Sequence, residues 1–254
     1  MPNKLPQNTQ PALLKKKRPM TGFFFFLSLF LVSILPQAAH ADKTAEINKL
    51  LRQIRSHNRD VRRKAATALR ERKKFVIPRL RKDLQNKDSD VRRKAALALG
   101  YLGEEAKATT PALIRALKDK DIHVRYLAAR ALGRIGVEAK AAVPALIQAL
   151  KDRDWLVRQD AAEALGMMGT RGRNAIPALI RALRDREHVV RGEAAKALGH
   201  LNVKNKAVVS ALMRALKDKD SAVRYHAASA LNWIGMENQA TKEALRKNRP
   251  RRRR

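Results

Sequence analysis

A short phrase that begins with Val-Arg recurs along this chain at an almost constant interval. The valines that open it are separated by 30 residues once and by 33 residues four times. A period of this length is the signature of stacked units that bury their apolar faces only against their neighbours. The sequence therefore predicts an all-α fold, an α-solenoid that works by presenting a long surface. The six valines are Val61, Val91, Val124, Val157, Val190 and Val223.

Each phrase indicates the second of two helices in its unit. The apolar residues after Val124 have the i+4, i+7, i+8 and i+11 spacing of one helical face. Three residues before each valine stands a candidate N-cap, and five of these six are strong N-cap types. The helix ends at a repeated glycine, replaced once by asparagine, which predicts a left-handed residue there. The predicted N-caps are Asn58, Asp88, Asp121, Asp154, Glu187 and Asp220, and the predicted C-terminal residues are Gly103, Gly136, Gly169, Asn202 and Gly235.

The first helix of each unit is predicted to begin at a proline, at Pro111, Pro144 and Pro177 in three units. Proline is tolerated in the first helical turn. We count six helix pairs between about residue 44 and residue 235. Residues 239–248 repeat the first-helix pattern alone and would cap the stack, so the repeat domain is predicted to span residues 42–248. Residues 249–254 are basic, lack apolar periodicity and are predicted to be a disordered tail.

The N-terminal segment has the order of a secretory signal. A basic cluster at residues 15–18 precedes a 13-residue apolar stretch at residues 23–35, and Ala39-His40-Ala41 follows. The apolar stretch is shorter than the roughly 20 residues that cross a bilayer. We therefore expect cleavage after Ala41, a mature chain that begins at Asp42, and a periplasmic or secreted protein. The alternative is an uncleaved anchor that holds the repeats outside the inner membrane.

The net charge of +33 exceeds what solubility requires and indicates an acidic partner or surface. Candidates are an acidic protein, nucleic acid, or an anionic lipid or glycolipid. The chain contains no cysteine, so a disulfide framework and a thiolate metal site are excluded.

The repeating unit D-x-x-V-R-x-x-A-A-x-A-L-G, with P-A-L-I-x-A-L between units, resembles the HEAT-like repeat first described in phycobilin lyases. The resemblance covers nearly the whole mature chain. It implies a right-handed superhelix of HEAT-like repeats whose second helices line the concave side. Related repeats occur in bilin lyase subunits, a di-iron hydroxylase, DNA-repair glycosylases and plain scaffolds, so the resemblance implies a fold more than a function.

Catalytic signals are weak in this sequence. The hydroxylase relatives bind iron through His-Glu pairs, and no His-Glu dipeptide occurs here. The histidines occupy different repeat positions, whereas a metal site needs several converging ligands. We therefore expect no enzyme activity, no metal and no cofactor.

An arginine follows each valine and forms a ladder along the repeats. It could be a phosphate-binding track, but a residue repeated in every unit is better explained as part of the framework. A companion row of aspartates lies six residues before the arginines, where forked ion pairs would join adjacent units. The ladder consists of Arg62, Arg92, Arg125, Arg158, Arg191 and Arg224 with Asp119, Asp152, Asp185 and Asp218.

The partner surface is predicted at positions that vary between repeats. These lie two, three and six residues after each valine, off the apolar face of the second helix, and two tryptophans add aromatic anchors. The predicted partner-binding residues are Arg63, Lys64, Arg93, Lys94, Tyr126, Arg130, Trp155, Gln159 and Tyr225. A second basic layer flanks the aspartates and predicts a positive ridge. Its residues are Lys118, Lys120, Lys151, Arg153, Arg184, Arg186, Lys217 and Lys219, with Arg52, Lys82, Arg115, Arg181 and Arg214 on the first helices.

The leading functional interpretation is a monomeric, non-enzymatic scaffold that binds an acidic protein outside the cytoplasm. The second is an electrostatic binder of polyanions, with possible membrane-surface association. The third is an enzyme or lyase subunit, which rests on family analogy alone. Salt dependence of binding would distinguish the first two interpretations, and bound iron or bilin would favour the third.

Overall fold

The computed structural model describes residues 44–248. The predicted signal segment, residues 1–41, and the basic tail, residues 249–254, lie outside the described residues. The chain divides into two units, Met1–Glu46 and Ile47–Arg254, and the repeats belong to the second. The described part of this unit is helical and contains no strand. No helix in residues 44–248 combines the length and the apolar character that crossing a bilayer demands.

The helices alternate between two kinds, as the repeat predicts. The second helices, here called B helices, are α2 (Arg59–Glu71), α4 (Ser89–Leu102), α6 (Ile122–Ile135), α8 (Trp155–Met167), α10 (His188–His200) and α12 (Ser221–Trp233). The first helices, here called A helices, are residues 44–53, α3 (Lys73–Asp83), α5 (Thr110–Ala116), α7 (Val143–Ala149), α9 (Ile176–Ala182), α11 (Lys206–Ala215) and α13 (Gln239–Asn248). The prediction of an all-α solenoid with six pairs and a terminal half-repeat is confirmed.

The caps set the length of each B helix. Five predicted N-caps accept hydrogen bonds from backbone N–H groups of the first turn, for example Asp121 from His123 at 2.7 Å. Glu187, the one weak N-cap type, makes no such bond. The residue after each B helix from α4 onward, or one residue later, has positive φ, including Asn202 at 47°. A residue without Cβ adopts this backbone most easily, which explains the repeated glycine.

Three connections fold into regular structure that the sequence pattern did not reveal. They are the 3-10 helices η1 (Gly103–Thr109), η2 (Gly136–Ala142) and η3 (Gly169–Ala175). A 3-10 helix has three residues per turn, so residues three apart share a face. In η2, Ala139 and Ala142 are both buried by this spacing. Each connection therefore adds small side chains to the core before the proline starts the next A helix.

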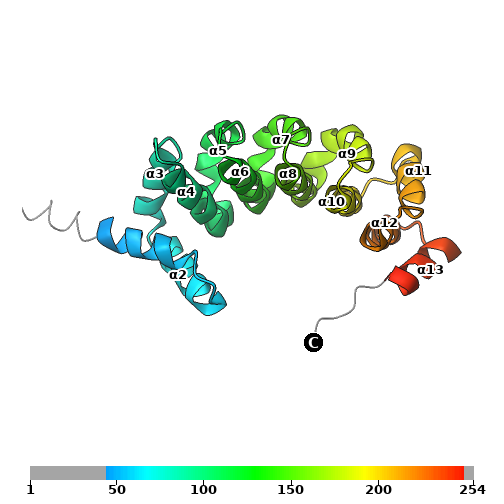
Figure 1. The fold of residues 1–254 in the computed structure, drawn as a ribbon, viewed down its shortest axis with the longest axis horizontal. Coiled ribbons are helices and arrows are strands. Elements are labelled where there is room, and N and C mark those ends of the chain that lie inside the picture. The colour runs from blue at the N-terminus through cyan, green and yellow to red at the C-terminus, as the bar shows by residue number, and fades with distance from the viewer. Residues whose placement is uncertain (1–43, 249–254) are drawn as a thin grey trace, which may run out of the picture. The chain divides into compact units, whose positions relative to one another are not determined.

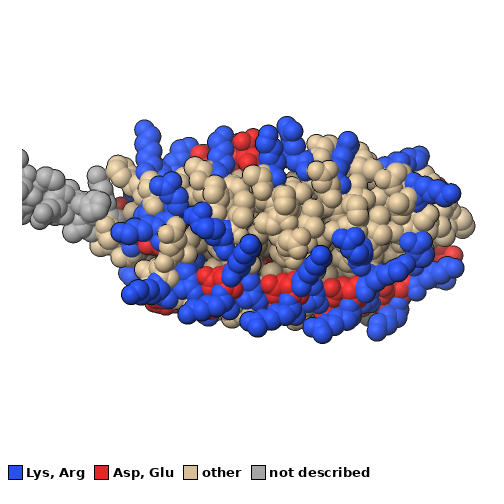
Figure 2. Space-filling model, turned by 90° about the horizontal axis from the view of Figure 1, so that it is seen from above, with Lys and Arg blue, Asp and Glu red and all other residues tan. Residues whose placement is uncertain are grey.

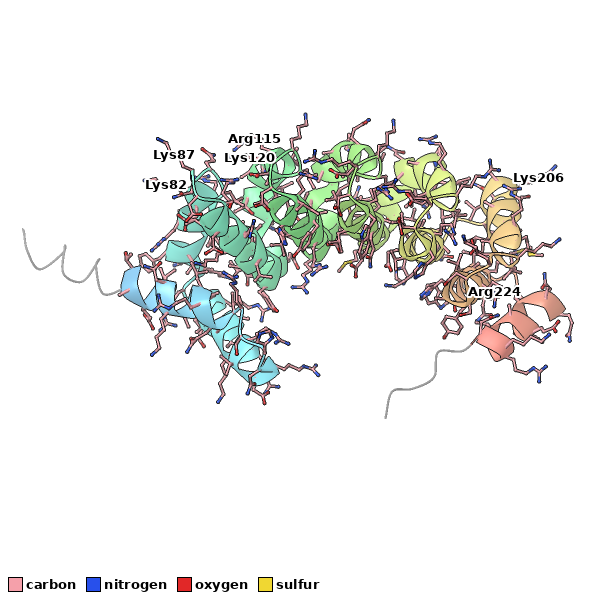
Figure 3. The ribbon with its side chains drawn as sticks, viewed as in Figure 1. Lys82, Lys87, Arg115, Lys120, Lys206 and Arg224 are labelled. Atoms are coloured by element: carbon pink, nitrogen blue, oxygen red, sulfur yellow. The ribbon has the colours of Figure 1, made fainter. Side chains whose placement is uncertain are left out.

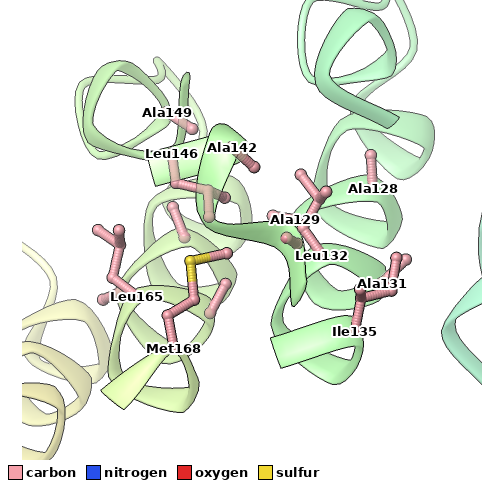
Figure 4. Close-up of a cluster of buried hydrophobic side chains, with 14 of the residues drawn as sticks. Ala128, Ala129, Ala131, Leu132, Ile135, Ala142, Leu146, Ala149, Leu165 and Met168 are labelled. Carbon is pink, nitrogen blue, oxygen red and sulfur yellow. The ribbon is translucent and has the colours of Figure 1, made fainter. Parts of the chain in front are cut away.

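The core runs continuously between the two rows of helices. Leu132, Leu146 and Leu165 are fully buried where α6, α7 and α8 meet (Figure 4). Within this unit the A helices form an outer row and the B helices an inner row (Figure 1). From α4 to α12, each B helix packs along its length against the next B helix, whereas α2 makes a smaller contact with α4. The exposed side of the inner row is therefore a surface to which every repeat contributes.

Candidate partner-binding surface

The arginine ladder is used inside the fold. Arg158 donates from Nε to Asp185 Oδ2 at 2.7 Å and from Nη2 to Oδ1 at 2.9 Å. Its Nη1 donates to the backbone oxygen of Asp152 at 2.9 Å. The two side chains are only 7% and 13% exposed. A guanidinium whose donors are committed in this way is not available to a ligand phosphate.

Four forked pairs of the same kind join five successive repeats, from the second to the sixth. The pairs are Arg92–Asp119, Arg125–Asp152, Arg158–Asp185 and Arg191–Asp218. The last arginine, Arg224, donates instead to Oδ1 of Asn248 on α13, and Arg62 donates to the backbone oxygens of Ser56 and His57.

Two carboxylates of the ladder, those of Asp185 and Asp218, are held in their charged form. Burial opposes ionisation of Asp185 and Asp218, but hydrogen bonds from the paired arginine and from a backbone N–H outweigh it and lower both pKa values. The last two forked pairs of the ladder therefore join their repeats through carboxylates with lowered pKa values.

Two exposed cations of the inner row lie side by side in the sequence of the first repeat. The Arg63 side chain is 77% exposed, and its ion pair with Asp60 is long, at 3.6 Å. Lys64 beside it is also exposed. Farther along, Tyr126, Gln159 and Tyr225 are half-buried. The inner row thus changes along its length from cationic to mixed and aromatic.

Several predicted partner-binding residues are already paired within the protein. Arg93 forms an ion pair with Asp121, the N-cap of α6, and Lys94 with Asp90 at 2.6 Å. Arg130 contacts both carboxylate oxygens of Asp160 at 3.0 Å. Arg93 and Arg130 join neighbouring B helices and Lys94 is paired within α4, so all three are less available to a partner than the sequence pattern suggested.

The prediction that all three variable positions face solvent is wrong at three sites. Leu127 and Asp160 are buried, with Asp160 only 2% exposed, although both lie three residues after a valine. Gly192, two residues after its valine, is buried against His226. The reason is lateral packing, because the next B helix covers the side of the helix on which these residues lie.

A further row of exposed residues was missed by the sequence interpretation, apart from Trp233. It lies ten residues after each valine from Val91 onward and consists of Tyr101, which is half-buried, and of Arg134, Met167, His200 and Trp233, which are exposed. In the first repeat this position holds an exposed carboxylate, Glu71. The Arg134 guanidinium lies 5.1 Å from the centre of the Tyr101 ring, and Trp233 stacks on His200 at 4.8 Å. Positions two, six and ten follow each other at the i, i+4 interval of one helix face. Their variation between repeats was the available signal.

We call these three positions on the B helices, together with the exposed Lys64 of the first repeat, the inner surface. It carries aromatic side chains of the kind that anchor interfaces, among them Trp233, which is 49% exposed. Trp155, at the start of α8, is also exposed. The inner surface therefore carries exposed cations in its first repeat and scattered aromatic side chains along its length.

A buried carboxylate lies behind this surface. Burial raises the pKa of Asp160 to about 6, from a usual value of 3.8, despite its contact with Arg130. The charges of Glu163 and Glu193 act in the same direction. The folded protein therefore binds this proton more tightly than the unfolded chain does.

A pH-dependent stability follows from Asp160. Because its folded pKa lies above its unfolded pKa, stability falls as the pH rises from about 4 through about 6. In Asp160→Asn this contribution is absent. We expect wild type to lose about 2 kcal/mol relative to the variant between pH 4 and pH 7. Urea unfolding of both proteins at each pH measures the difference, and parallel stability curves would contradict it.

The outer row carries exposed cations that are not paired within the described part of the chain. Lys118, Lys151 and Arg153 are exposed, and none of the ion pairs in residues 44–248 includes them. Figure 2 shows Lys and Arg side chains standing out along this side, while most of the visible acidic side chains gather in one row near its lower edge. The positive ridge thus holds cations that the fold leaves available.

Comparison with known proteins identifies the fold family. The family model for HEAT repeats matches residues 47–110, 77–166, 110–199 and 176–254. The chain belongs to the HEAT repeat family. No curated protein matches this chain significantly.

Solved structures agree with this HEAT-repeat assignment. One is an engineered protein, 26% identical, with a TM-score of 0.55 over 74% of this chain and 96% of that chain. A second is the CpcE–CpcF complex of phycocyanin lyase from Nostoc sp. PCC7120, 26% identical, with a TM-score of 0.51 over 78% and 80%. A third is YibA of E. coli, 23% identical, with a TM-score of 0.58 over 79% and 74%, which shows likeness of fold alone.

Proposed function

We propose that this HEAT-repeat protein is a non-enzymatic adaptor that binds an acidic protein through its inner surface, outside the cytoplasm. The observation that carries the proposal is that framework residues and inner-surface residues have separate roles within each repeat. The framework residues are fixed in type and committed to caps, core or ladder pairs. The inner surface varies in type from repeat to repeat and remains exposed or half-buried at most positions.

The charge of the partner follows from the first repeat. Arg63 and Lys64 are exposed, and only Arg63 has an acidic neighbour, at 3.6 Å. Exposed cations at one end of a surface favour a partner whose acidic residues lie at that end. The aromatic residues farther along, such as Tyr225 and Trp233, would then hold apolar residues of the same segment. The location outside the cytoplasm is supported by the order of charged, apolar and small residues within positions 15–41.

We also propose that the repeats are of the HEAT-like type found in phycobilin lyases. This assignment is supported by the repeated unit and by the 26% identity to the CpcE–CpcF complex. The alternative that this similarity favours is a lyase subunit. A bilin bound to the protein isolated from cells would support that alternative against the adaptor.

The test is affinity capture from an envelope fraction with wild type and two charge-reversal variants. Arg63→Glu with Lys64→Glu alters the inner surface, and Lys151→Glu with Arg153→Glu makes the same charge change on the ridge. We expect wild type and the ridge variant to retain the same protein partner, and the inner variant to bind it at least about tenfold more weakly, a loss of about 1.4 kcal/mol. Arg93 is left unchanged because its reversal would place two carboxylates together at the cap of α6.

Salt separates a specific complex from general attraction. Raising the ionic strength from about 0.1 M to about 1 M shortens the Debye length from about 10 Å to about 3 Å. A partner held by the aromatic positions should survive this change. Loss of capture in the ridge variant together with normal capture by the inner variant would overturn the proposal.

A further inference from the structure

We propose that the outer side of the repeats, centred on the cleft between α3 and α5, docks onto a membrane surface rich in anionic lipid. The cleft has a volume of about 540 Å³ and is lined by Pro78, Arg81, Lys82, Gln85, Ala108, Pro111, Ala112 and Arg115. Three of these residues are cations and none is a carboxylate. This proposal concerns a different face from the inner surface and stands independently of the adaptor function.

The cations of this cleft are free to act on a ligand. Arg81, Lys82 and Arg115 are exposed, and they take part in none of the ion pairs within residues 44–248. On the inner row, in contrast, Arg93 forms an ion pair with Asp121, and Arg130 forms one with Asp160. The fold therefore neutralises much of the charge on the inner side and leaves it uncompensated on the outer side.

Neighbouring turns enlarge the cationic area. Lys82 and Lys87 lie together above α3, and Arg115 and Lys120 above α5, all pointing away from the inner row (Figure 3). Lys118 adds a further exposed cation in the turn after α5. Adjacent packed helices lie about 8–10 Å apart, so the cations of successive turns continue this area along the outer row, although the row on the A helices is broken by Gln148 on α7.

The chemistry of the surface favours lipid headgroups over nucleic acid. Long, exposed Lys and Arg side chains without fixed partners do not define positions for particular phosphates. A fluid lipid surface can bring its anions to such cations, and each Lys or Arg near it contributes roughly 1 kcal/mol, or about fivefold in binding. The cleft contains no aromatic side chain on which a base could stack. Its apolar residues are alanine and proline, so binding should be peripheral and reversible by salt.

Docking by the outer row would leave the inner surface facing away from the membrane. A partner protein could then bind the B helices while the A helices contact lipid. Lipid binding by the A helices and partner binding by the B helices can be tested separately, because charge reversal on one face leaves the other face unchanged.

The experiment is co-sedimentation of the protein isolated from cells, with the N-terminus it carries there, with two kinds of vesicle. One contains equal parts phosphatidylcholine and phosphatidylglycerol, and the other contains phosphatidylcholine alone. We expect binding to the anionic vesicles only. Lys82→Glu with Arg115→Glu should weaken it at least about 30-fold. Lys82→Gln with Arg115→Gln should weaken it less, because it removes the two charges without reversing them.

The matched control carries the same total change of charge on the inner surface. Arg63→Glu with Lys64→Glu should bind anionic vesicles within about threefold of wild type, and circular dichroism establishes that each variant is folded. Equal weakening by the inner and outer variants would overturn the proposal, because it would show general attraction rather than a docking face. Equal sedimentation with both vesicles would overturn it too. Duplex DNA binding that depends on Lys82 and Arg115, without vesicle binding, would assign the surface to nucleic acid instead.

Discussion

Replacing Arg158 with alanine should lower the free energy of unfolding by about 3 kcal/mol. The variant loses two hydrogen bonds to Asp185 and at least one to the backbone oxygen of Asp152. It also leaves the Asp185 carboxylate, which is 13% exposed, without its cation. Removal of one member of a buried ion pair is costly because the remaining charge stays desolvated. Urea unfolding followed by circular dichroism measures the change.

The control is Arg153→Ala in the neighbouring turn. Arg153 is exposed and makes no ion pair within residues 44–248, so its loss should change the free energy of unfolding by less than about 0.5 kcal/mol. An unchanged stability for Arg158→Ala, with a sharp loss of partner or polyanion binding, would show that the ladder is a binding track. Below the usual aspartate pKa of 3.8, acidification should reduce the stability of wild type, since Asp185 and Asp218 have lowered pKa values and their contribution is lost as they become protonated.

Gly133→Ala is expected to destabilise the solenoid by about 2 kcal/mol. An added Cβ on this glycine would lie 2.8 Å from the Cα atom of Ala164 on the next B helix. Because the added Cβ clashes with a backbone atom, the clash can be removed only if α6 and α8 move apart along their contact. Overpacking of this kind typically costs about 1–3 kcal/mol.

Gly100 is a matched control at the same position of the preceding repeat. A Cβ added there would lie 3.5 Å from the Cα atom of Ala131, which is ordinary contact. Gly100→Ala should be neutral or should stabilise by up to about 1 kcal/mol, because alanine favours the helix. Thermal unfolding of both variants decides the matter, and equal melting temperatures would contradict the inferred close approach at Gly133.

The sequence predicted the framework because each framework residue repeats with the period of the fold. The asparagine at position 202 is an example, since a glycine position that accepts asparagine indicates positive φ, and Asn202 has φ 47°. The ladder was also within reach, because Arg158 and Asp185 lie 27 residues apart and recur together.

The candidate site was less predictable because its environment depends on contacts between helices. A single-helix pattern places Asp160 beside the core, but only the packing of α8 against its neighbours buries it. Arg93 likewise reaches Asp121 at the start of the next B helix, 28 residues away. Within residues 44–248, the Arg93–Asp121 pair and the Arg130–Asp160 pair each occur in one repeat only, so no sequence period reveals them.

The most direct test of the account is site-specific photo-crosslinking in cells from two glutamine positions in one repeat. Gln159 lies on the inner surface of α8, and Gln148 is exposed on α7 in the outer row. A photoreactive residue that replaces Gln159 should give an adduct with a partner protein, and one that replaces Gln148 should give none. A protein adduct from position 148 with none from position 159 would contradict the assignment of the inner surface.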